Sequence, residues 1–228
     1  MALIGLFGLA LIAAIIILPQ VWVRRTMQRH GTPRPDFPGT GGELARHLVD
    51  HFKLDGVGVE QTDRGDHYDP EARVVRLSAE TYSRPSLTAV AIAAHEVGHA
   101  IQHHRGETGL KMRQSLVRIA QVSDRFAAIF FIAAPVLTLI ARSPGAFLAM
   151  AGIGIALLAV RVLVHLVTLP VEYDASFGKA LPILKEGGYL RDEDLGGARS
   201  VLRAAAFTYV AGALMSLVDL ARWVRLLR

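Results

Sequence analysis

The stretch AAHEVGHAIQ, residues 93–102, is the most informative part of the sequence. It lies in a run of helical composition and places His95 and His99 four residues apart, on one helix face and ~6 Å from each other. Two imidazoles in this arrangement can bind one zinc ion, with the intervening Glu96 directed at a water molecule on that ion. The pattern HEVGH therefore predicts a helix with His95 and His99 as metal ligands and Glu96 as general base.

A catalytic zinc ion needs a third protein ligand, and the chain has no cysteine to supply one. His103 would lie ~12 Å from His95 along the same helix, which is too far. Asp55, in a Leu-Asp-Gly triplet, lies in a polar segment ahead of both histidines and is a poor candidate. Glu172, the first acidic residue after two long apolar runs, is the preferred third ligand, and Asp174 is the alternative.

The composition indicates membrane segments combined with a polar part. Of the 228 residues, 52% are hydrophobic and 20% are charged, and the mean hydropathy is +0.35. The net charge of +5 could indicate nucleic-acid binding, but the arginines are scattered or lie beside apolar runs, and no aromatic residues are interleaved with them. We therefore expect a lipid bilayer as a partner, and no nucleic acid.

Four apolar runs cover residues 3–18, 126–141, 145–169 and 204–220. The first has no positive charge before it and is followed by Arg24 and Arg25, which predicts a retained anchor with its N-terminus outside the cell. Only three residues separate the second run from the third, so these two should form an antiparallel hairpin. Pro170 is predicted to open a new helix that reaches Lys185. Whether the fourth run, with its basic end, spans the bilayer stays open.

The segment between the first two runs should hold a small sheet and the HEVGH helix. The patterns predict a helix at 43–52, extended segments at 57–60 and 73–77 with a turn at 66–70 between them, and the HEVGH helix at 86–104. The extended segments should belong to a small sheet of two or three strands. The whole chain then divides into five parts. These are an N-terminal anchor (1–23), a cytoplasmic portion with the HEVGH helix (24–124), a membrane hairpin (125–169), a helix carrying the third ligand with its connection (170–203), and a C-terminal apolar helix with a basic end (204–228).

Three motifs carry a resemblance to a known family: DHYDP at 66–70, AAHEVGHAIQ at 93–102 and PVEYDAS at 170–176. With the leading anchor and the later apolar runs, they resemble the YugP-like bacterial membrane zinc metallopeptidases, and more distantly the HtpX proteases, which are gluzincins. The resemblance implies a mainly α, membrane-anchored, zincin-like fold with a small β-sheet and about four apolar helices, and it gives Glu172 the role of third ligand. Ser176 stands where the wider group has an aspartate.

The resemblance also implies a zinc-dependent endopeptidase in the inner or plasma membrane, with one zinc ion per chain. Its substrates would be peptides or membrane proteins. The distribution of Lys and Arg around the apolar runs predicts that the catalytic portion faces the cytoplasm. His67, Tyr68 and Tyr173 are candidate donors to the oxyanion, and the strand at 73–77 could pair with an extended substrate. Two alternatives are a non-catalytic membrane scaffold with a structural or vestigial metal site, and an intramembrane protease of the site-2 type.

Overall fold

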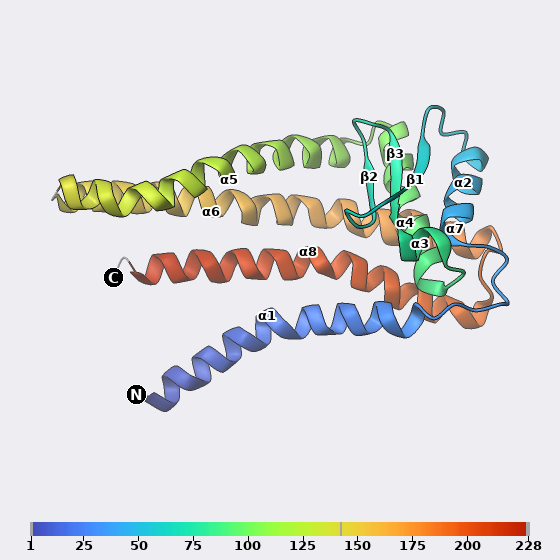
Figure 1. The fold of residues 1–228 in the computed structure, drawn as a ribbon, viewed down its shortest axis with the longest axis horizontal. Helices are drawn as coiled ribbons and strands as arrows, with labels where there is room; N and C mark the ends of the chain where they lie inside the picture. The colour runs from blue at the N-terminus through green and yellow to red at the C-terminus, as the bar shows by residue number, and fades with distance from the viewer. Residues whose placement is uncertain (1, 142, 227–228) are drawn as a thin grey trace.

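A computed structural model describes residues 2–141 and 143–226. The fold is mainly helical, with one small sheet (Figure 1). The helices are α1 (Ala2–His30), α2 (Gly41–His51), α3 (Ala79–Ser83), α4 (Leu87–His104), α5 (Thr108–Ala141), α6 (Pro144–Tyr173), α7 (Leu181–Glu186) and α8 (Asp192–Leu226). The strands are β1 (Gly58–Thr62), β2 (His67–Asp69) and β3 (Val74–Ser78), and a π-helical segment, η1 (Asp174–Ala180), joins α6 to α7.

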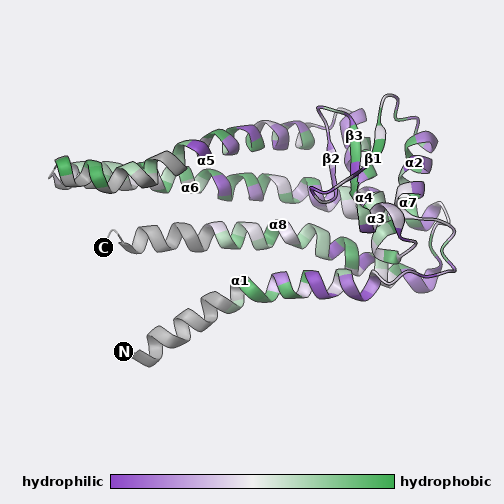
Figure 2. Cartoon of the chain, viewed as in Figure 1, coloured by the Kyte–Doolittle hydropathy of each residue, from purple (hydrophilic) through white to green (hydrophobic). Residues whose placement is uncertain are grey.

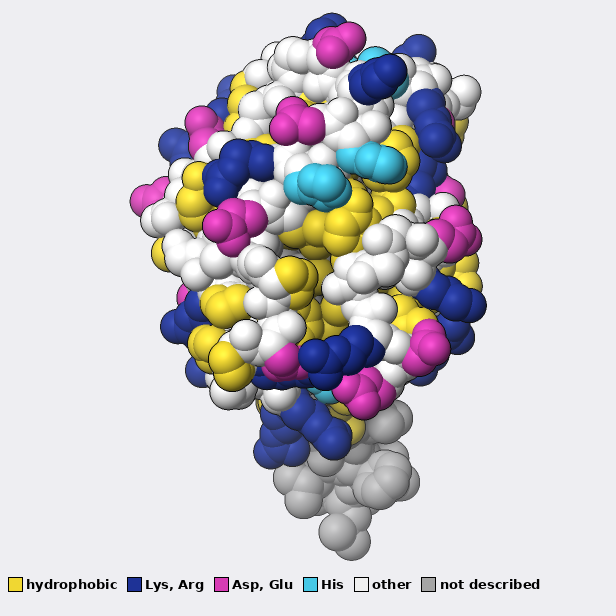
Figure 3. Space-filling view, turned by 90° about the vertical axis from the view of Figure 1, so that its right-hand side faces the viewer, with side chains coloured by type: hydrophobic (Ala, Val, Ile, Leu, Met, Phe, Trp, Pro, Cys, Tyr) yellow, Lys and Arg dark blue, Asp and Glu magenta, His cyan; other side chains and the backbone are white. Residues whose placement is uncertain are grey.

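Long helices extend from a polar head (Figure 1). The head contains the sheet, α2, α3, α4 and α7, while α5, α6, α8 and α1 pack side by side in that order. Hydrophobic residues dominate the described outer parts of α5 and α6, and hydrophilic residues are concentrated in the head (Figure 2). The outer end of the head carries interspersed acidic and basic side chains (Figure 3), as is usual for a surface in water.

One continuous helical stretch of the described residues, Leu148–Glu186, is long and apolar enough to cross a membrane. Only 6% of its most apolar window is buried, unlike the core helix of a soluble protein. About four apolar helices were expected, and among the described residues one helical stretch meets this criterion. The second apolar run belongs to α5, whose first half is polar. Most side chains of the first apolar run, and those at the end of the fourth, lie outside the described residues. Arg142 and Arg228 also lie outside the described residues.

The sheet differs from the prediction in two ways. The motif DHYDP is not a turn, because His67–Asp69 form β2, and the turn follows, with Asp69 accepting hydrogen bonds from the backbone N–H groups of Glu71 and Ala72. The strand order is β1-β3-β2, with β1 parallel and β2 antiparallel to β3. Because β3 lies in the centre, the strand predicted at 73–77 offers no free edge, and the edge strands are β1 and β2.

The HEVGH helix, α4, is the central element of the head. It begins after Ser86, whose hydroxyl accepts a hydrogen bond from the N–H of Ala89, and it ends at His104, as predicted. Every residue from Ala89 to Gln102 is buried, since α2, β3, η1 and α8 surround the helix. A helix buried on all sides holds its side chains in fixed directions, which is what a metal site requires.

The hairpin of α5 and α6 forms as predicted, but Pro170 does not open a new helix. It lies inside α6, which continues to Tyr173 and then through η1. Proline removes one helical hydrogen bond and need not end a helix whose other bonds and packing persist. Glu172 is therefore in the last turn of a long helix, where an acidic residue gains nothing from the helix dipole.

Candidate metal centre

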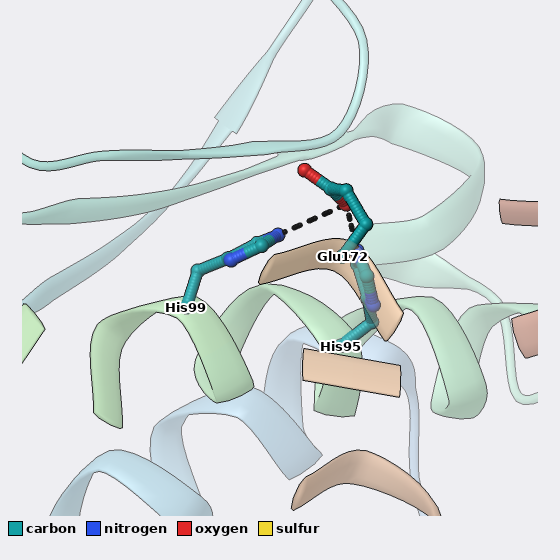
Figure 4. Close-up of side chains that lie close together, drawn as sticks. All are labelled: His95, His99 and Glu172. Carbon is teal, nitrogen blue, oxygen red and sulfur yellow. Dashed lines mark hydrogen bonds and ion pairs between the residues drawn. The ribbon is translucent and has the colours of Figure 1, made fainter. Parts of the chain in front are cut away.

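Three buried side chains from two distant parts of the chain converge beside α4 (Figure 4). The Nε2 atoms of His95 and His99 lie 3.2 Å and 3.3 Å from Oε2 of Glu172, respectively. The ligand atoms all lie within 4.8 Å of one another, and Glu172 is fully buried. The structure thus brings together the three residues that the sequence suggested as ligands.

Close helix packing makes this convergence possible. The α5–α6 hairpin returns the chain to the head, so that the end of α6 and η1 lie against α4. At the contact, a Cβ atom on Gly98 would lie 2.9 Å from the carbonyl oxygen of Ala175, closer than real Cβ atoms approach an oxygen. Gly98, the glycine of HEVGH, therefore lets the backbone of η1 approach the helix that carries the histidines.

Hydrogen bonds to the far side of each imidazole set its tautomer. The side-chain N–H groups of Gln102 donate to the carbonyl of Val171 and to Asp174, so its oxygen, 2.9 Å from Nδ1 of His99, must accept. The hydroxyl of Ser176 lies 3.0 Å from Nδ1 of His95 and donates to the carbonyl of Leu202, so it also accepts from the imidazole. Both Nδ1 atoms therefore carry the proton, and both Nε2 atoms face Glu172 with a lone pair.

This donor set fits a zinc ion. Two imidazole nitrogens and a carboxylate oxygen are the ligands of many catalytic zinc sites, and bonds of ~2.0–2.1 Å in a tetrahedron place ligand atoms ~3.3 Å apart. The separations of 3.2 Å and 3.3 Å match this value. Two lone pairs directed at a carboxylate oxygen repel it unless a cation or a proton lies between them, so a divalent cation satisfies all three atoms together.

Glu96 lies on the same buried helix and lines the same cavity as the three ligand candidates. Burial raises the pKa of its carboxyl from 4.5 to about 7, and the neighbouring carboxylate of Glu172 adds to the shift, while His95 opposes it. A carboxyl with a pKa near neutrality can both accept and return a proton at physiological pH.

The cavity beside these residues has a volume of about 220 Å³. His67 and Tyr68 line it, as expected for two of the candidate oxyanion donors. The third candidate, Tyr173, is 61% exposed, contacts Phe177 and does not line the cavity, because it follows Glu172 on the helix and points to another side.

The other candidates have different surroundings. Asp174 forms an ion pair with Lys179 and accepts a hydrogen bond from Gln102, so it supports the site without entering the ligand group. His103 contacts the hydroxyl of Tyr68. Asp55 is exposed. None of these three residues joins the three converging ligand candidates.

Two residues of the cavity gave no signal in the sequence. Arg113, near the start of α5, lies 3.0 Å from Oε1 of Glu172 as an ion pair, and it donates a hydrogen bond of 3.0 Å to Tyr209 of α8. An arginine ahead of an apolar run and a tyrosine within one are ordinary features of membrane helices. Only the folding of α5 and α8 against α6 shows that they face the metal site.

A helix with two histidines and a glutamate, completed by a second glutamate from another helix, defines a site of the zinc metallopeptidase class. The family model described as "Putative neutral zinc metallopeptidase" matches residues 6–228. The chain belongs to this family. It is 37% identical over 208 residues to the "Putative membrane protease YugP" of Bacillus subtilis (strain 168), an alignment that covers 90% of this chain and 88% of that protein. No solved structure matches the chain.

Proposed function

We propose that the chain is a membrane-bound, zinc-dependent endopeptidase. The observation that carries the proposal is the convergence of His95, His99 and Glu172 next to Glu96 on one cavity. The family description and the name of the Bacillus relative support the same function. We further propose that the substrates are peptides or membrane proteins, that the chain lies in the cell membrane, and that the head faces the cytoplasm, as the charge pattern predicts.

The reaction would be the addition of water to a peptide bond. Zinc held by His95, His99 and Glu172 would lower the pKa of water to ~7 and polarise the substrate carbonyl. Glu96 accepts the proton that the water loses as its oxygen bonds to the carbonyl carbon. Glu96 then donates that proton to the amide nitrogen while the C–N bond breaks, so that the products are a carboxylate and an amine.

The surroundings of the cavity suggest how a peptide is held. His67 and Tyr68, which the sequence suggested as oxyanion donors, both line the cavity. However, Nδ1 of His67 lies 2.8 Å from the carbonyl oxygen of Gly65, and the hydroxyl of Tyr68 lies 2.7 Å from Nδ1 of His103, so both groups already have partners. His67 and Tyr68 belong to β2, an edge strand that pairs only with β3. We propose that an extended substrate pairs along the free edge of β2, which takes the role that the sequence suggested for the strand at 73–77.

Two alternatives are less well supported. A structural zinc site usually has four protein ligands, and no fourth acid, cysteine or histidine of the described residues joins this group. An intramembrane protease of the site-2 type would carry HEVGH at bilayer depth, whereas α4 lies among the strands and short helices of the head (Figure 1).

The decisive experiment compares zinc content and proteolysis in purified wild type, His95→Ala and Glu96→Gln, all in detergent. We expect the first variant to lose both zinc and activity, because a ligand is gone. The second should keep about one zinc ion per chain and lose hydrolysis of a fluorogenic peptide library by ~10²–10⁴-fold, the usual contribution of a general base. A zinc-loaded wild type that cleaves no peptide would favour the scaffold.

A further inference from the structure

Arg113 and Tyr209 meet Glu172 at the wall of the cavity. A single terminal nitrogen of Arg113 lies 3.0 Å from both Oε1 of Glu172 and the hydroxyl oxygen of Tyr209. The guanidinium carbon also lies 5.6 Å from the centre of the tyrosine ring. One side chain of α5 thus holds a residue of α6 and a residue of α8 at the same point.

Arg113 leaves the hydroxyl hydrogen of Tyr209 available for donation. Guanidinium can only donate, so the oxygen of Tyr209 accepts from Arg113 and its own hydrogen goes to an acceptor, which in the absence of substrate is the carboxylate of Glu172. An oxyanion in the cavity would compete with Glu172 for this hydrogen. The hydroxyl of Tyr68 contacts Nδ1 of His103 at 2.7 Å. With Arg113 on Oε1 of Glu172, the other oxygen, Oε2, is the one that faces the two histidines.

From this arrangement, and resting on the proposed function, we infer that Tyr209 is a catalytic residue whose hydroxyl donates a hydrogen bond to the oxyanion of the tetrahedral intermediate. Arg113 is its positioning residue and also holds the carboxylate of Glu172. Tyr209 lines the cavity together with Glu96 and the three ligand candidates, so its hydroxyl and the general base face the same space. A donor fixed in advance in a buried site stabilises developing charge without having to reorganise.

The test of Tyr209 is the variant Tyr209→Phe, which removes only the hydroxyl. We expect kcat to fall by ~10²–10³-fold, the usual loss for one oxyanion donor, with unchanged KM and unchanged bound zinc. The chain offers a matched control in Tyr82, whose hydroxyl also accepts from an arginine, Arg46, at 2.7 Å, but outside the cavity. Tyr82→Phe should keep the wild-type kcat. An unchanged kcat in Tyr209→Phe, or a change in KM alone, would overturn the role of Tyr209.

The test of Arg113 uses Arg113→Lys, with Arg46→Lys as control. Because lysine cannot reach Glu172 and Tyr209 with the same planar group, we expect zinc affinity to fall by ~10–100-fold and the visible spectrum of the Co²⁺-substituted protein to change. In a Tyr209→Phe background at saturating zinc, Arg113→Lys should lower kcat little further. A wild-type Co²⁺ spectrum and zinc affinity in Arg113→Lys would overturn the positioning role.

These results separate the present inference from the proposed function. A zinc-loaded wild type without any proteolysis overturns the proposed function and the role of Tyr209 together, while zinc affinity and the Co²⁺ spectrum still decide the role of Arg113. An active wild type with an equally active Tyr209→Phe overturns the role of Tyr209 alone. If Tyr209→Phe folds poorly, Tyr209→His, which retains a donor, should keep more activity than Tyr209→Leu, and equal loss in both contradicts the inference.

Discussion

At the scale of single residues, the orientation of the two imidazoles depends on the groups that contact their Nδ1 atoms. The hydroxyl of Ser176 accepts a hydrogen bond from Nδ1 of His95. The side-chain oxygen of Gln102 accepts a hydrogen bond from Nδ1 of His99, while its amide nitrogen donates to the carbonyl of Val171 in α6. A neutral acceptor fixes the tautomer as an aspartate does, but it adds no negative charge to the imidazole.

We therefore expect Ser176→Ala to weaken zinc binding by ~10–100-fold, because Nδ1 of His95 loses its acceptor in a buried place. Zinc affinity can be measured by competition with a chelating dye. Ser200→Ala, which removes an exposed hydroxyl bonded to the carbonyl of Gly196, is the matched control and should bind zinc like the wild type. Equal affinities in the two variants would contradict the role of Ser176.

Glu96 predicts how the stability of the metal-free protein depends on pH. Its pKa is raised to about 7 in the folded state, against 4.5 when unfolded, so between these values the folded chain holds a proton that the unfolded chain has lost. The free energy of unfolding then falls as the pH rises through this window, by ~3 kcal/mol at about 1.4 kcal/mol per pKa unit.

Glu96→Gln has no such group and should melt at a higher temperature than metal-free wild type at pH 8, with the difference vanishing at pH 4.5 and below. Melting can be followed by circular dichroism in detergent with a chelator present. The exposed Glu71 provides the control, since Glu71→Gln should not change the pH dependence. If the melting temperatures of Glu96→Gln and wild type differed by the same amount at all pH values, the buried carboxyl of Glu96 would have no part in the pH dependence of stability.

At the scale of elements, the site depends on the contact between α4 and η1. The π-helical segment carries Ser176, and its first residues continue the helix that ends with Glu172, so both side chains reach the same helix face of α4. Single π-helical turns within α-helices are frequent at functional sites. The backbones can approach only because residue 98 has no side chain.

Gly98→Ala should therefore reduce stability by ~1–3 kcal/mol and weaken zinc binding, because the added methyl group would push η1 away from the histidines. Gly196, in α8, has open space at its Cβ position, and Gly196→Ala should be neutral or stabilising by ~0.4–1 kcal/mol. Thermal melting of both variants, with zinc titration, compares the two glycines. A Gly98→Ala variant as stable as Gly196→Ala would refute the packing argument.

At the scale of the whole molecule, the proposed metal would connect the head with the long helices. His95 and His99 belong to α4 in the head, while Glu172 ends α6, which carries the stretch long enough to cross a membrane. A ligand that binds only the folded chain stabilises it by mass action, by about 2.7 kcal/mol when its free concentration is ~100 times Kd.

Removal of zinc with a chelator should accordingly lower the melting temperature of the wild type, and added zinc should restore it. His95→Ala is the control, since a chain that cannot bind the ion should melt at the same temperature with and without chelator. A wild type whose melting is insensitive to chelation at full initial zinc occupancy would contradict a metal bridge between the two parts.

Much of the site follows from local sequence. The spacing of HEVGH predicts two imidazoles on one helix face, because helical periodicity is a local property, and the hairpin of apolar runs places Glu172 near them. The continuation of α6 through Pro170 and the pairing of β2 were predicted wrongly, because helical packing and strand pairing overrode the local preferences of proline and of DHYDP.

The sequence by itself determined the candidate chemistry of this protein: the types of the proposed metal ligands, the proposed general base, and a mainly helical chain with apolar segments. Only the tertiary structure decided which groups surround that chemistry. Arg113 and Tyr209 reach Glu172 from helices far apart in the chain, and Ser176 supplies the hydrogen-bond acceptor for His95. Such contacts depend on how whole helices pack against one another, and no short stretch of sequence determines that packing.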